Sequence, residues 1–322
     1  MKTIWLLLIG VLLAGATLAQ EINFSRVQDM AIWYNQSLKT DKQNSVKLNY
    51  RNVQYGGLIA YNSISVMADM PLLSKSKKEA DNVGYFSASA GAASDKSNQG
   101  ILNNTMGVLG LSYAVPIGKN ETYIAAGFQG VYYQSNLNIN GGSFFGDQYD
   151  KYGPVDGMAS SDRFRAGWSY GYFNMNAGIS VFNNSTFNKW YIGASVMHIN
   201  KPYTDQNKTK EFQLRQAIGI QGGYKFATGL DDDEIGFYAS MNWQGRAYKH
   251  FYNGTWSTPI KQLPGSAVGL GLGYRYEDAL VPNVELRYMK LILGIAYDVN
   301  VSGISASGIR RNGLEMAIRL DF

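Results

Sequence analysis

Apolar and polar residues alternate along most of this chain, and the last ten residues show the pattern most clearly. Leu314, Met316, Ile318, Leu320 and Phe322 fall on one side of an extended strand. Charged or small residues fall on the other side, because side chains in a strand point to opposite faces in turn. Strands of outer-membrane barrels have this pattern, with apolar side chains toward lipid and polar ones toward the lumen. A half-buried edge strand of a soluble sheet has it too, so the rest of the chain decides.

The same period of two recurs in twelve segments between Val46 and the end of the chain. Val284–Val301 counts as one of these strands, with a turn before it at Glu277–Asn283. A hairpin hidden within Gly245–Gly265, or a first strand near Asn23, would raise the total to fourteen. We therefore predict an all-β fold, a transmembrane antiparallel up-and-down β-barrel of twelve to fourteen strands, whose final strand pairs with the first.

The connections between the segments divide into two sets by their order in the chain. If the first strand runs outward, the inner turns are Ser74–Asn82, Gly118–Glu121, Asn183–Asn188, Ala227–Glu234 and Glu277–Asn283. The outer loops are then Val53–Leu58, Lys96–Gly100, Asn138–Ser169, Asn200–Glu211, Gly245–Gly265 and Ser302–Asn312. Outer-membrane barrels have short periplasmic turns and longer extracellular loops. The long loops all fall in the outer set, which favours such a barrel.

Polar side chains stand opposite the apolar stripe in many of these segments. In the dry core of a soluble protein such groups are costly unless they are paired, whereas a hydrated lumen accommodates them. The pattern therefore favours a transmembrane barrel over a soluble all-β protein. The candidate polar residues of the lumen are Lys47, Asn49, Arg51, Arg275, Asp298, Glu315 and Arg319.

The first nineteen residues have a pattern of their own. The basic residue Lys2 precedes the apolar run Ile4–Leu13, and the small residues of Ala14–Ala19 suit a cleavage site. This order is typical of a secretory signal peptide, and the apolar run is too short for a membrane span. We predict cleavage after Ala19, and the lack of a Cys there excludes a lipoprotein anchor.

Residues 20–44 have the least barrel-like pattern, and residues 45–322 form the predicted outer-membrane barrel. Phe24, Val27 and Met30 recur at a roughly helical spacing. We predict a short helix or an irregular segment that packs at the periplasmic mouth or plugs the barrel. A first strand in this segment is the alternative.

Composition supports a membrane barrel without thiol chemistry. The chain has 36 Gly, 23 Tyr and only 7 Pro, and glycine suits tightly curved strands while tyrosine suits membrane interfaces. It has no Cys, which excludes disulfides, zinc–thiolate sites and a catalytic thiol. The net charge of +5 is too mild to predict binding to nucleic acid. Beyond the signal peptide no apolar run reaches the length of a spanning helix, so if the chain crosses a lipid bilayer it does so with strands.

Few residues suit catalysis or metal binding. His198 near Ser195 or Asp205 is a weak candidate for a base beside a nucleophile, against the simpler interpretation of an interfacial histidine, and His250 lies in a loop. The acidic run 231–234 lacks the alternating ligands and the glycine of a calcium loop, and it is interpreted as a solvated turn. We predict no enzyme activity, no cofactor and no metal.

Two long outer loops form the candidate surface for binding a partner. Asn138–Ser169 and Gly245–Gly265 combine aromatic and basic side chains, and aromatic residues and Arg are enriched at protein interfaces. The candidate residues are Phe144, Phe145, Tyr149, Tyr152, Arg163, Arg165, Tyr248, Phe251, Tyr252 and Trp256.

Four short motifs, in order along the chain, resemble a known family. They are Asn49-Tyr50-Arg51-Asn52, His198-Ile199-Asn200-Lys201-Pro202, Tyr297-Asp298-Val299-Asn300 and the ending from Gly313 to Phe322. Together they resemble the PorP/SprF family of the Bacteroidetes type IX secretion system over nearly the whole mature chain. The chain departs from the family pattern at Tyr34–Ser37, where a Pro commonly follows the Asn, and at Val53–Tyr55, where a Trp-Pro pair is common.

This resemblance implies an outer-membrane barrel that works in type IX secretion and, in gliding bacteria, in the export and display of large adhesins. It implies the C-terminal domain of a secreted cargo protein as a partner and, for some members, a peptidoglycan-binding, OmpA-like periplasmic protein. The leading hypothesis is a non-enzymatic barrel of the cell outer membrane that holds or helps export a secreted surface protein. The alternative is a passive porin or a transporter of hydrophobic solutes.

Overall fold

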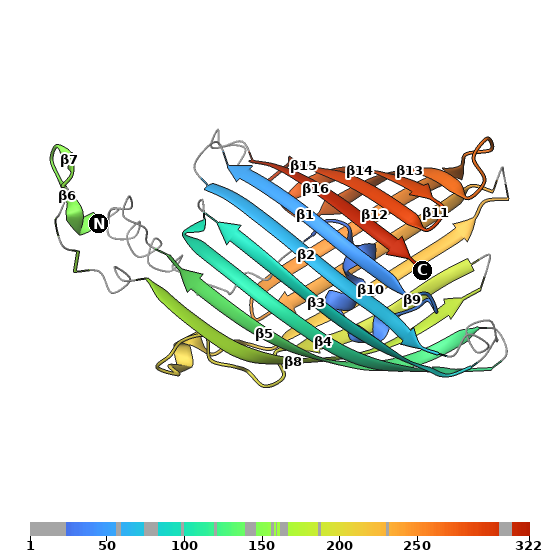
Figure 1. The fold of residues 1–322 in the computed structure, drawn as a ribbon, viewed down its shortest axis with the longest axis horizontal. Helices are drawn as coiled ribbons and strands as arrows, with labels where there is room; N and C mark the ends of the chain where they lie inside the picture. The colour runs from blue at the N-terminus through green and yellow to red at the C-terminus, as the bar shows by residue number, and fades with distance from the viewer. Residues whose placement is uncertain are drawn as a thin grey trace, which may run out of the picture.

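The computed structural model shows a closed β-barrel with a short helical segment inside it (Figure 1). It describes residues 24–55, 59–73, 83–97, 100–118, 121–138, 146–155, 158, 160–161, 167–185, 188–229, 232–302 and 311–322. The predicted signal peptide and its cleavage site lie outside these residues.

Fourteen strands of the described chain form the barrel wall. They are β1 (Ser45–Tyr55), β2 (Ile59–Leu72), β3 (Tyr85–Ser97), β4 (Leu102–Pro116), β5 (Thr122–Leu137), β8 (Trp168–Asn184), β9 (Asn188–Met197), β10 (Ala217–Ala227), β11 (Glu234–Gln244), β12 (Ala247–Pro259), β13 (Ser266–Arg275), β14 (Ala279–Tyr288), β15 (Leu291–Asn300) and β16 (Arg311–Asp321). Each strand pairs antiparallel with the next along the wall, and β16 pairs with β1 to close it. The predicted antiparallel, up-and-down barrel is confirmed.

Short elements occupy the lumen and two long connections. The α-helix α2 (Val27–Tyr34) and the 3₁₀ turn η1 (Gln36–Leu38) precede β1. The connection from β5 to β8 contains η3 (Gly146–Gln148), β6 (Tyr149–Asp150) and β7 (Gly153–Pro154), and the connection from β9 to β10 contains η4 (Lys210–Phe212). Among the residues described here, no helix is long and apolar enough to cross a membrane.

The final strand has the two faces that its sequence predicts. Met316 and Ile318 are exposed on the outer surface, whereas Glu315 and Ala317 are buried on the inner one. The same alternation of exposed apolar and buried small or polar residues runs through β4, β5 and β8. The outer surface is therefore the apolar wall that a lipid bilayer requires, while pairing of β1 with β16 leaves no open edge.

We expect deletion of Phe322 to reduce assembly of the barrel in the outer membrane. Its backbone amide donates a hydrogen bond to the carbonyl of Asn44 at 3.0 Å, and its ring is exposed at the end of the closing pair of strands. Deletion removes both this bond and an aromatic ring suited to the membrane boundary. The measurement is the amount of heat-modifiable barrel on gels of outer-membrane fractions, with Phe322→Tyr as the control. An unchanged amount after deletion would contradict the expectation.

Two segments differ from the prediction because tight turns interrupt them. Val284–Val301 is two strands, β14 and β15, joined at Met289, where the backbone is left-handed with a φ of 52°. Gly245–Gly265 is mostly strand β12, which follows a tight turn at Gly245 with a φ of 62°. The predicted inner turn Glu277–Asn283 is also wrong. The turn is 276–278, and it lies at the other end of the barrel because β12 adds one crossing before it.

The two ends of the barrel carry different connections. The end where β1 begins and β16 finishes carries 73–84, 117–121, 185–187, 228–233, 260–265 and 289–290. The other end carries 56–58, 98–101, 138–167, 198–216, 245–246, 276–278 and 301–310. The two longest connections share this second end, and Figure 1 shows β6 and β7 far from the C-terminus. We assign it to the extracellular side, because outer-membrane barrels place their longer loops there.

Candidate functional site

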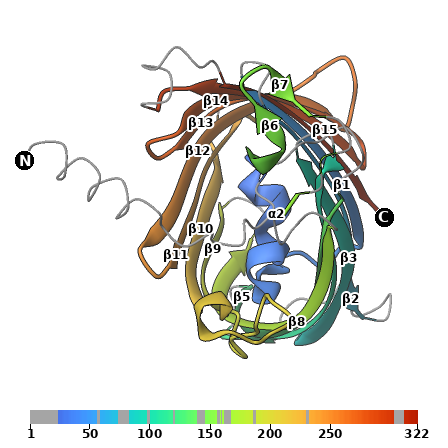
Figure 2. The ribbon, with the colours of Figure 1, turned by 90° about the vertical axis from the view of Figure 1, so that its left-hand side faces the viewer.

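The interior of the barrel is occupied by the residues that precede β1. We call residues 24–44 the plug segment, and Figure 2 shows its helix α2 inside the ring of strands. Met30, Gln36 and Ser37 are each at most 2% exposed. Asn35 ends α2 in an extended conformation, and its Oδ1 accepts a hydrogen bond from the amide of Ser37 at 3.0 Å, which caps η1. The predicted helical pattern is thus a helix and a 3₁₀ turn within the lumen.

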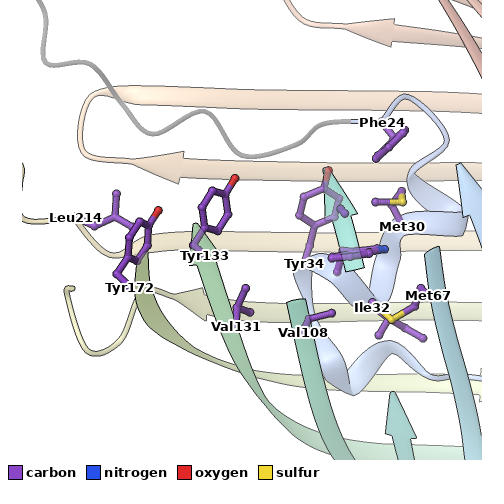
Figure 3. Close-up of a cluster of buried hydrophobic side chains, with 12 residues drawn as sticks. Phe24, Met30, Ile32, Tyr34, Met67, Val108, Val131, Tyr133, Tyr172 and Leu214 are labelled. Carbon is purple, nitrogen blue, oxygen red and sulfur yellow. The ribbon is translucent and has the colours of Figure 1, made fainter. Parts of the chain in front are cut away.

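One side of the plug segment packs into an apolar cluster on the inner wall. Figure 3 shows Tyr34 and Met30 of the plug segment in one cluster with Tyr133 and Tyr172, which belong to β5 and β8. The rings of Tyr133 and Tyr172 stack with their centroids 5.4 Å apart. Full burial of a large apolar side chain contributes about 1.5–3 kcal/mol. The cluster therefore holds α2 against the wall.

Side chains of the wall bind the backbone of the plug segment. Gln129 Nε2 donates to the carbonyl of Ile32 at 2.6 Å, and Ser180 Oγ donates to the carbonyl of Ser37 at 2.9 Å. These groups are buried, and a buried carbonyl left without a partner costs about 1–3 kcal/mol. The wall thus satisfies the carbonyls that a short helix and a 3₁₀ turn leave free at their ends.

Glycines on four adjacent strands make room for the plug segment. We call Gly110, Gly127, Gly178 and Gly193, which lie on the inner faces of β4, β5, β8 and β9, the glycine patch. Gly127 and Gly178 stand directly opposite each other in the register. A Cβ atom at Gly127 would lie 2.7 Å from the backbone nitrogen of Ser37, closer than real Cβ contacts. Only glycine permits this approach of two backbones.

Glu315 fixes the beginning of the plug segment. Its carboxylate accepts hydrogen bonds from the amides of Ser25 at 2.6 Å and Arg26 at 3.0 Å, immediately before α2. A negative charge is favourable at the N-terminus of a helix because of the helix dipole. The Arg26 guanidinium pairs with Asp29 and with Glu285 of β14, each at 2.6 Å. The first turn of the plug is thus held by side chains from β14 and β16.

A chain of ion pairs extends from this point toward the extracellular turn 276–278. Asp298 Oδ2 pairs with Arg51 at 2.6 Å and with Arg275 at 3.0 Å, and Arg275 also pairs with Asp278 at 2.8 Å. Arg311 pairs with Asp278 as well. Burial acts to raise the pKa of Asp278, but the charges on Arg275 and Arg311 outweigh it and hold that pKa below its usual value. Each buried charge in this chain therefore has a partner of opposite sign, which offsets the cost of its removal from water.

A second group of charges holds the periplasmic end of the plug segment. Lys39 pairs with Asp41 at 2.6 Å and with Asp69 of β2, and Lys47 pairs with Asp69 at 3.0 Å. Arg319 of β16 pairs with Asp41 at 3.2 Å. Burial acts to raise the pKa of Asp41, but the charges on Lys39 and Arg319 outweigh it and lower that pKa. The plug is therefore anchored at both ends by charged residues of the wall.

Two cavities lie on opposite sides of α2. A cavity of about 470 Å³ opens toward the periplasmic end and is lined on the plug side by Gln28 and Ala31. A cavity of about 40 Å³ lies among Met30, Trp33 and Tyr133. The plug segment thus separates a roomy polar space from a small apolar one.

The comparison with protein families decides the identity of this barrel. A family model described as "Type IX secretion system membrane protein PorP/SprF" matches residues 37–313. The chain belongs to the PorP/SprF family. The resemblance drawn from the four motifs is confirmed, and Arg51, Asp298 and Glu315 of those motifs meet beside the beginning of the plug segment. The PorP/SprF family is a secretion-associated membrane family and not a family of enzymes.

Solved structures similar to this PorP/SprF barrel share its fold at very low sequence identity. The toluene transporter TodX of Pseudomonas putida has 6% identity and a TM-score of 0.50, with 95% of each chain covered. A FadL homologue of Pseudomonas aeruginosa has 8% identity and a TM-score of 0.50, with 89% of this chain and 92% of that chain covered. A comparison with curated proteins gives no significant match. Fold and family together support a location in the outer membrane.

All of the predicted polar residues of the lumen lie on the inner face of the PorP/SprF barrel, where they contact the plug segment, one another or, in the case of Lys47, Asp69 of β2. Asn49 Nδ2 lies 3.3 Å from the sulfur of Met30, and the other residues belong to the charged groups described above. The residues are Lys47, Asn49, Arg51, Arg275, Asp298, Glu315 and Arg319. The sequence pattern predicted that water in the lumen solvates these side chains. Beside the plug segment, residues of the protein itself are their partners instead.

The predicted outer-loop residues divide into three groups in the PorP/SprF barrel. Tyr149 and Tyr152 are exposed in and beside the β6–β7 hairpin, and Phe144, Phe145, Arg163 and Arg165 lie outside the described residues. The placement of Tyr248, Phe251, Tyr252 and Trp256 in a loop is wrong, because all four lie in β12. Aromatic and polar residues alternate there with the period of a strand, so Phe251 faces the lumen and Tyr252 the outside.

Several residues that hold the plug were not predicted from the sequence. They are Arg26, Asp29, Asn35 and Gln36 of the plug segment, and Asp69, Ser89, Ser180 and Glu285 of the wall. Asn35 and Gln36 follow the helical stretch at the point where the chain departs from the family pattern. That departure was the one sequence feature that singled out Asn35 and Gln36. In the structure, Gln36 accepts a hydrogen bond from Ser89 at 2.7 Å.

Proposed function

We propose that this PorP/SprF protein is a plugged anchor in type IX secretion, which holds or helps export a secreted surface protein at its extracellular end. One observation carries the proposal: the plug segment lies inside the lumen and is fixed to the wall by buried polar contacts along its length. A barrel filled in this way offers a surface and a mouth to a partner more readily than a path for solutes. By its family, the cargo would be an adhesin-type protein recognised by its C-terminal domain, as in gliding Bacteroidetes.

The connection that contains the β6–β7 hairpin supports this role by its internal hydrogen bonds and its exposed aromatic rings. The amide of Ser161 and the hydroxyl of Ser160 donate to Asp147, which lowers the pKa of that carboxyl and ties the connection together. Tyr152 is 83% exposed, and the ammonium of Lys151 lies 4.7 Å from the centre of its ring. Exposed aromatic residues of this kind are typical contacts at protein interfaces.

The test is recovery of a secreted protein with this barrel from native outer membranes. We expect mild-detergent purification of the tagged protein, followed by mass spectrometry, to recover a large secreted partner. The double variant Tyr149→Ala, Tyr152→Ala should recover at least severalfold less, because exposed aromatic anchors dominate many interfaces. The matched control is Tyr113→Ala, Tyr288→Ala, which removes two exposed tyrosines from the strands β4 and β14. Equal recovery by the two double variants, or recovery of no secreted protein, would contradict the proposal.

The same purification tests two further parts of the proposal. An OmpA-like, peptidoglycan-binding protein in the sample would support a periplasmic partner. Peptide mapping of the mature chain tests cleavage after Ala19, since the first peptide should then begin at Gln20. A mature chain that begins at another residue would contradict that site.

The alternative role as a passive porin or a transporter of hydrophobic solutes has less support. The apolar cavity beside Met30 and Tyr133 measures about 40 Å³, whereas sites for small ligands usually measure about 300–1,000 Å³. A stable conductance of the full-length chain in planar bilayers, comparable to that of an open porin, would favour the alternative over the anchor.

A further inference from the structure

Three cationic side chains line the periplasmic cavity on the side formed by β9, β10 and β14. Lys189 of β9, Lys225 of β10 and Arg287 of β14 all line it. Lys189 and Lys225 stand directly opposite each other in the pairing of β9 with β10. Like charges at directly opposed positions destabilise a sheet. Strand pairing therefore gives no reason for these two lysines to face each other.

Glu234 and Glu285 are the carboxylates that line this side of the cavity, and each is already paired with a cation. Glu234 pairs with Lys225, and Glu285 pairs at 2.6 Å with Arg26 of the plug segment but only at 3.6 Å with Arg287. Within the described part of the chain, Arg287 Nε is buried without a hydrogen-bond partner and Lys189 has no ion pair. The wall thus leaves the guanidinium of Arg287 and the ammonium of Lys189 available to a ligand.

The opposite side of the same cavity is neutralised. There, Lys39 and Lys47 share Asp69, and Arg319 pairs with Asp41 at 3.2 Å. A further carboxylate, Asp321, lies 2.7 Å from Arg319. The excess of positive charge is therefore confined to the side formed by β9, β10 and β14.

We propose that Lys189, Lys225 and Arg287 bind a carboxylate of an acidic peptide segment that enters the cavity from the periplasm. A guanidinium matches the two oxygens of a carboxylate, and lysines add charge without strict geometry. The cavity, at about 470 Å³, is within the usual size of a ligand site.

The other lining residues favour a peptide over a free anion. Tyr191 and Tyr238 add aromatic rings beside the cations, and Asn183 and Asn184 add amide groups at the rim. A peptide can pack its apolar atoms on these rings and also bond to the amides and the charges, whereas phosphate has no apolar surface to pack on the rings. The site lies at the periplasmic end and stands apart from cargo binding at the extracellular end.

The experiment is calorimetric titration of the full-length protein in detergent micelles with tetraglutamate, tetraglutamine and inorganic phosphate. We expect tetraglutamate to bind, with an affinity that falls as salt is added. Arg287→Gln should weaken this binding at least about tenfold, because charge-assisted hydrogen bonds are the strong ones. Lys189→Gln should weaken it too, without loss of thermal stability, since it breaks no ion pair and removes a repulsion from Lys225.

The matched control is Lys290→Gln, an exposed lysine in the turn between β14 and β15 at the same end of the barrel. Heat-modifiability shows that each variant is folded. Loss of binding in both cavity variants, with binding kept in the control, supports the site. Equal binding of tetraglutamine, phosphate binding as tight as that of tetraglutamate, equal loss in Lys290→Gln, or no binding of tetraglutamate would each overturn it.

Discussion

Deletion of residues 24–38 should turn this closed barrel into a conducting channel. The deletion removes α2 and η1 but keeps Lys39, whose pairs with Asp41 and Asp69 hold the remaining linker at the periplasmic end. Full-length protein should be silent in planar lipid bilayers, and the shortened protein should give stable steps of the size of an open porin. This is the largest change that we expect from any variant, because the plug segment is the part of the described chain that lies across the lumen.

The wall should survive this deletion, because its strands pair with one another and close through β1 and β16 without the plug. Water would enter and solvate Glu315 and Asp298, which otherwise face a costly burial without their partners. Heat-modifiability of the shortened protein tests whether the wall has closed. A milder variant, Glu315→Gln, should give brief openings, since it removes the charge that holds the amides of Ser25 and Arg26. A folded but silent deletion variant would refute the assignment of a plug.

The substitution Gly127→Leu should release the plug segment while the barrel remains intact. A side chain at this position meets the backbone of η1 at Ser37 and Gln36, and a backbone cannot rotate away as a side chain can. Overpacking of this kind costs about 1–3 kcal/mol, which corresponds to about a 5- to 150-fold larger population of the released state. The effect should therefore be large without any loss of charge.

The readout uses the absence of cysteine from the chain. Ser37→Cys introduces a single thiol at a position that is 1% exposed, so a water-soluble maleimide should label it slowly while the plug is seated. Adding Gly127→Leu should speed labelling in proportion to the released population. The matched control is Gly107→Leu on β4, where a Cβ atom would meet nothing within 4 Å. Equal labelling with either leucine would show that the glycine patch does not seat the plug.

Much of the wall was predictable because alternation has a simple physical cause. Lipid on one side and polar groups on the other force a period of two, so the faces of β16 and its pairing with β1 follow from the residues alone. The hairpin between β14 and β15 was missed because Met289 and Lys290 are not typical turn residues. A signal was present nevertheless. The apolar residues that face outward have even numbers before the turn, as at Leu286, and odd numbers after it, as at Leu293. This change marks a two-residue turn, because such a turn pairs each even position with an odd one, as Leu286 pairs with Leu293.

The plug was harder to predict than the wall because its contacts join residues that are far apart in the sequence. Periodicity indicated a helix near Met30, but nothing local indicates that Ser180 binds the carbonyl of Ser37. The glycine patch depends on the register of four strands, and a shift of one residue would turn Gly127 toward lipid. Polar residues such as Glu315 were correctly placed in the lumen, yet their partners required the folded structure.

The contacts of Glu315 also set an order of events in the assembly of this protein. The amide of Ser25 bonds to a residue 290 positions later in the chain, and Arg26 bonds to Glu285, 259 positions later. Both partners belong to the last strands of the barrel, β14 and β16. The start of the plug can therefore be fastened only after the C-terminal strands have been inserted. An unfinished barrel therefore lacks this fastening, and closure of the lumen cannot precede completion of the wall.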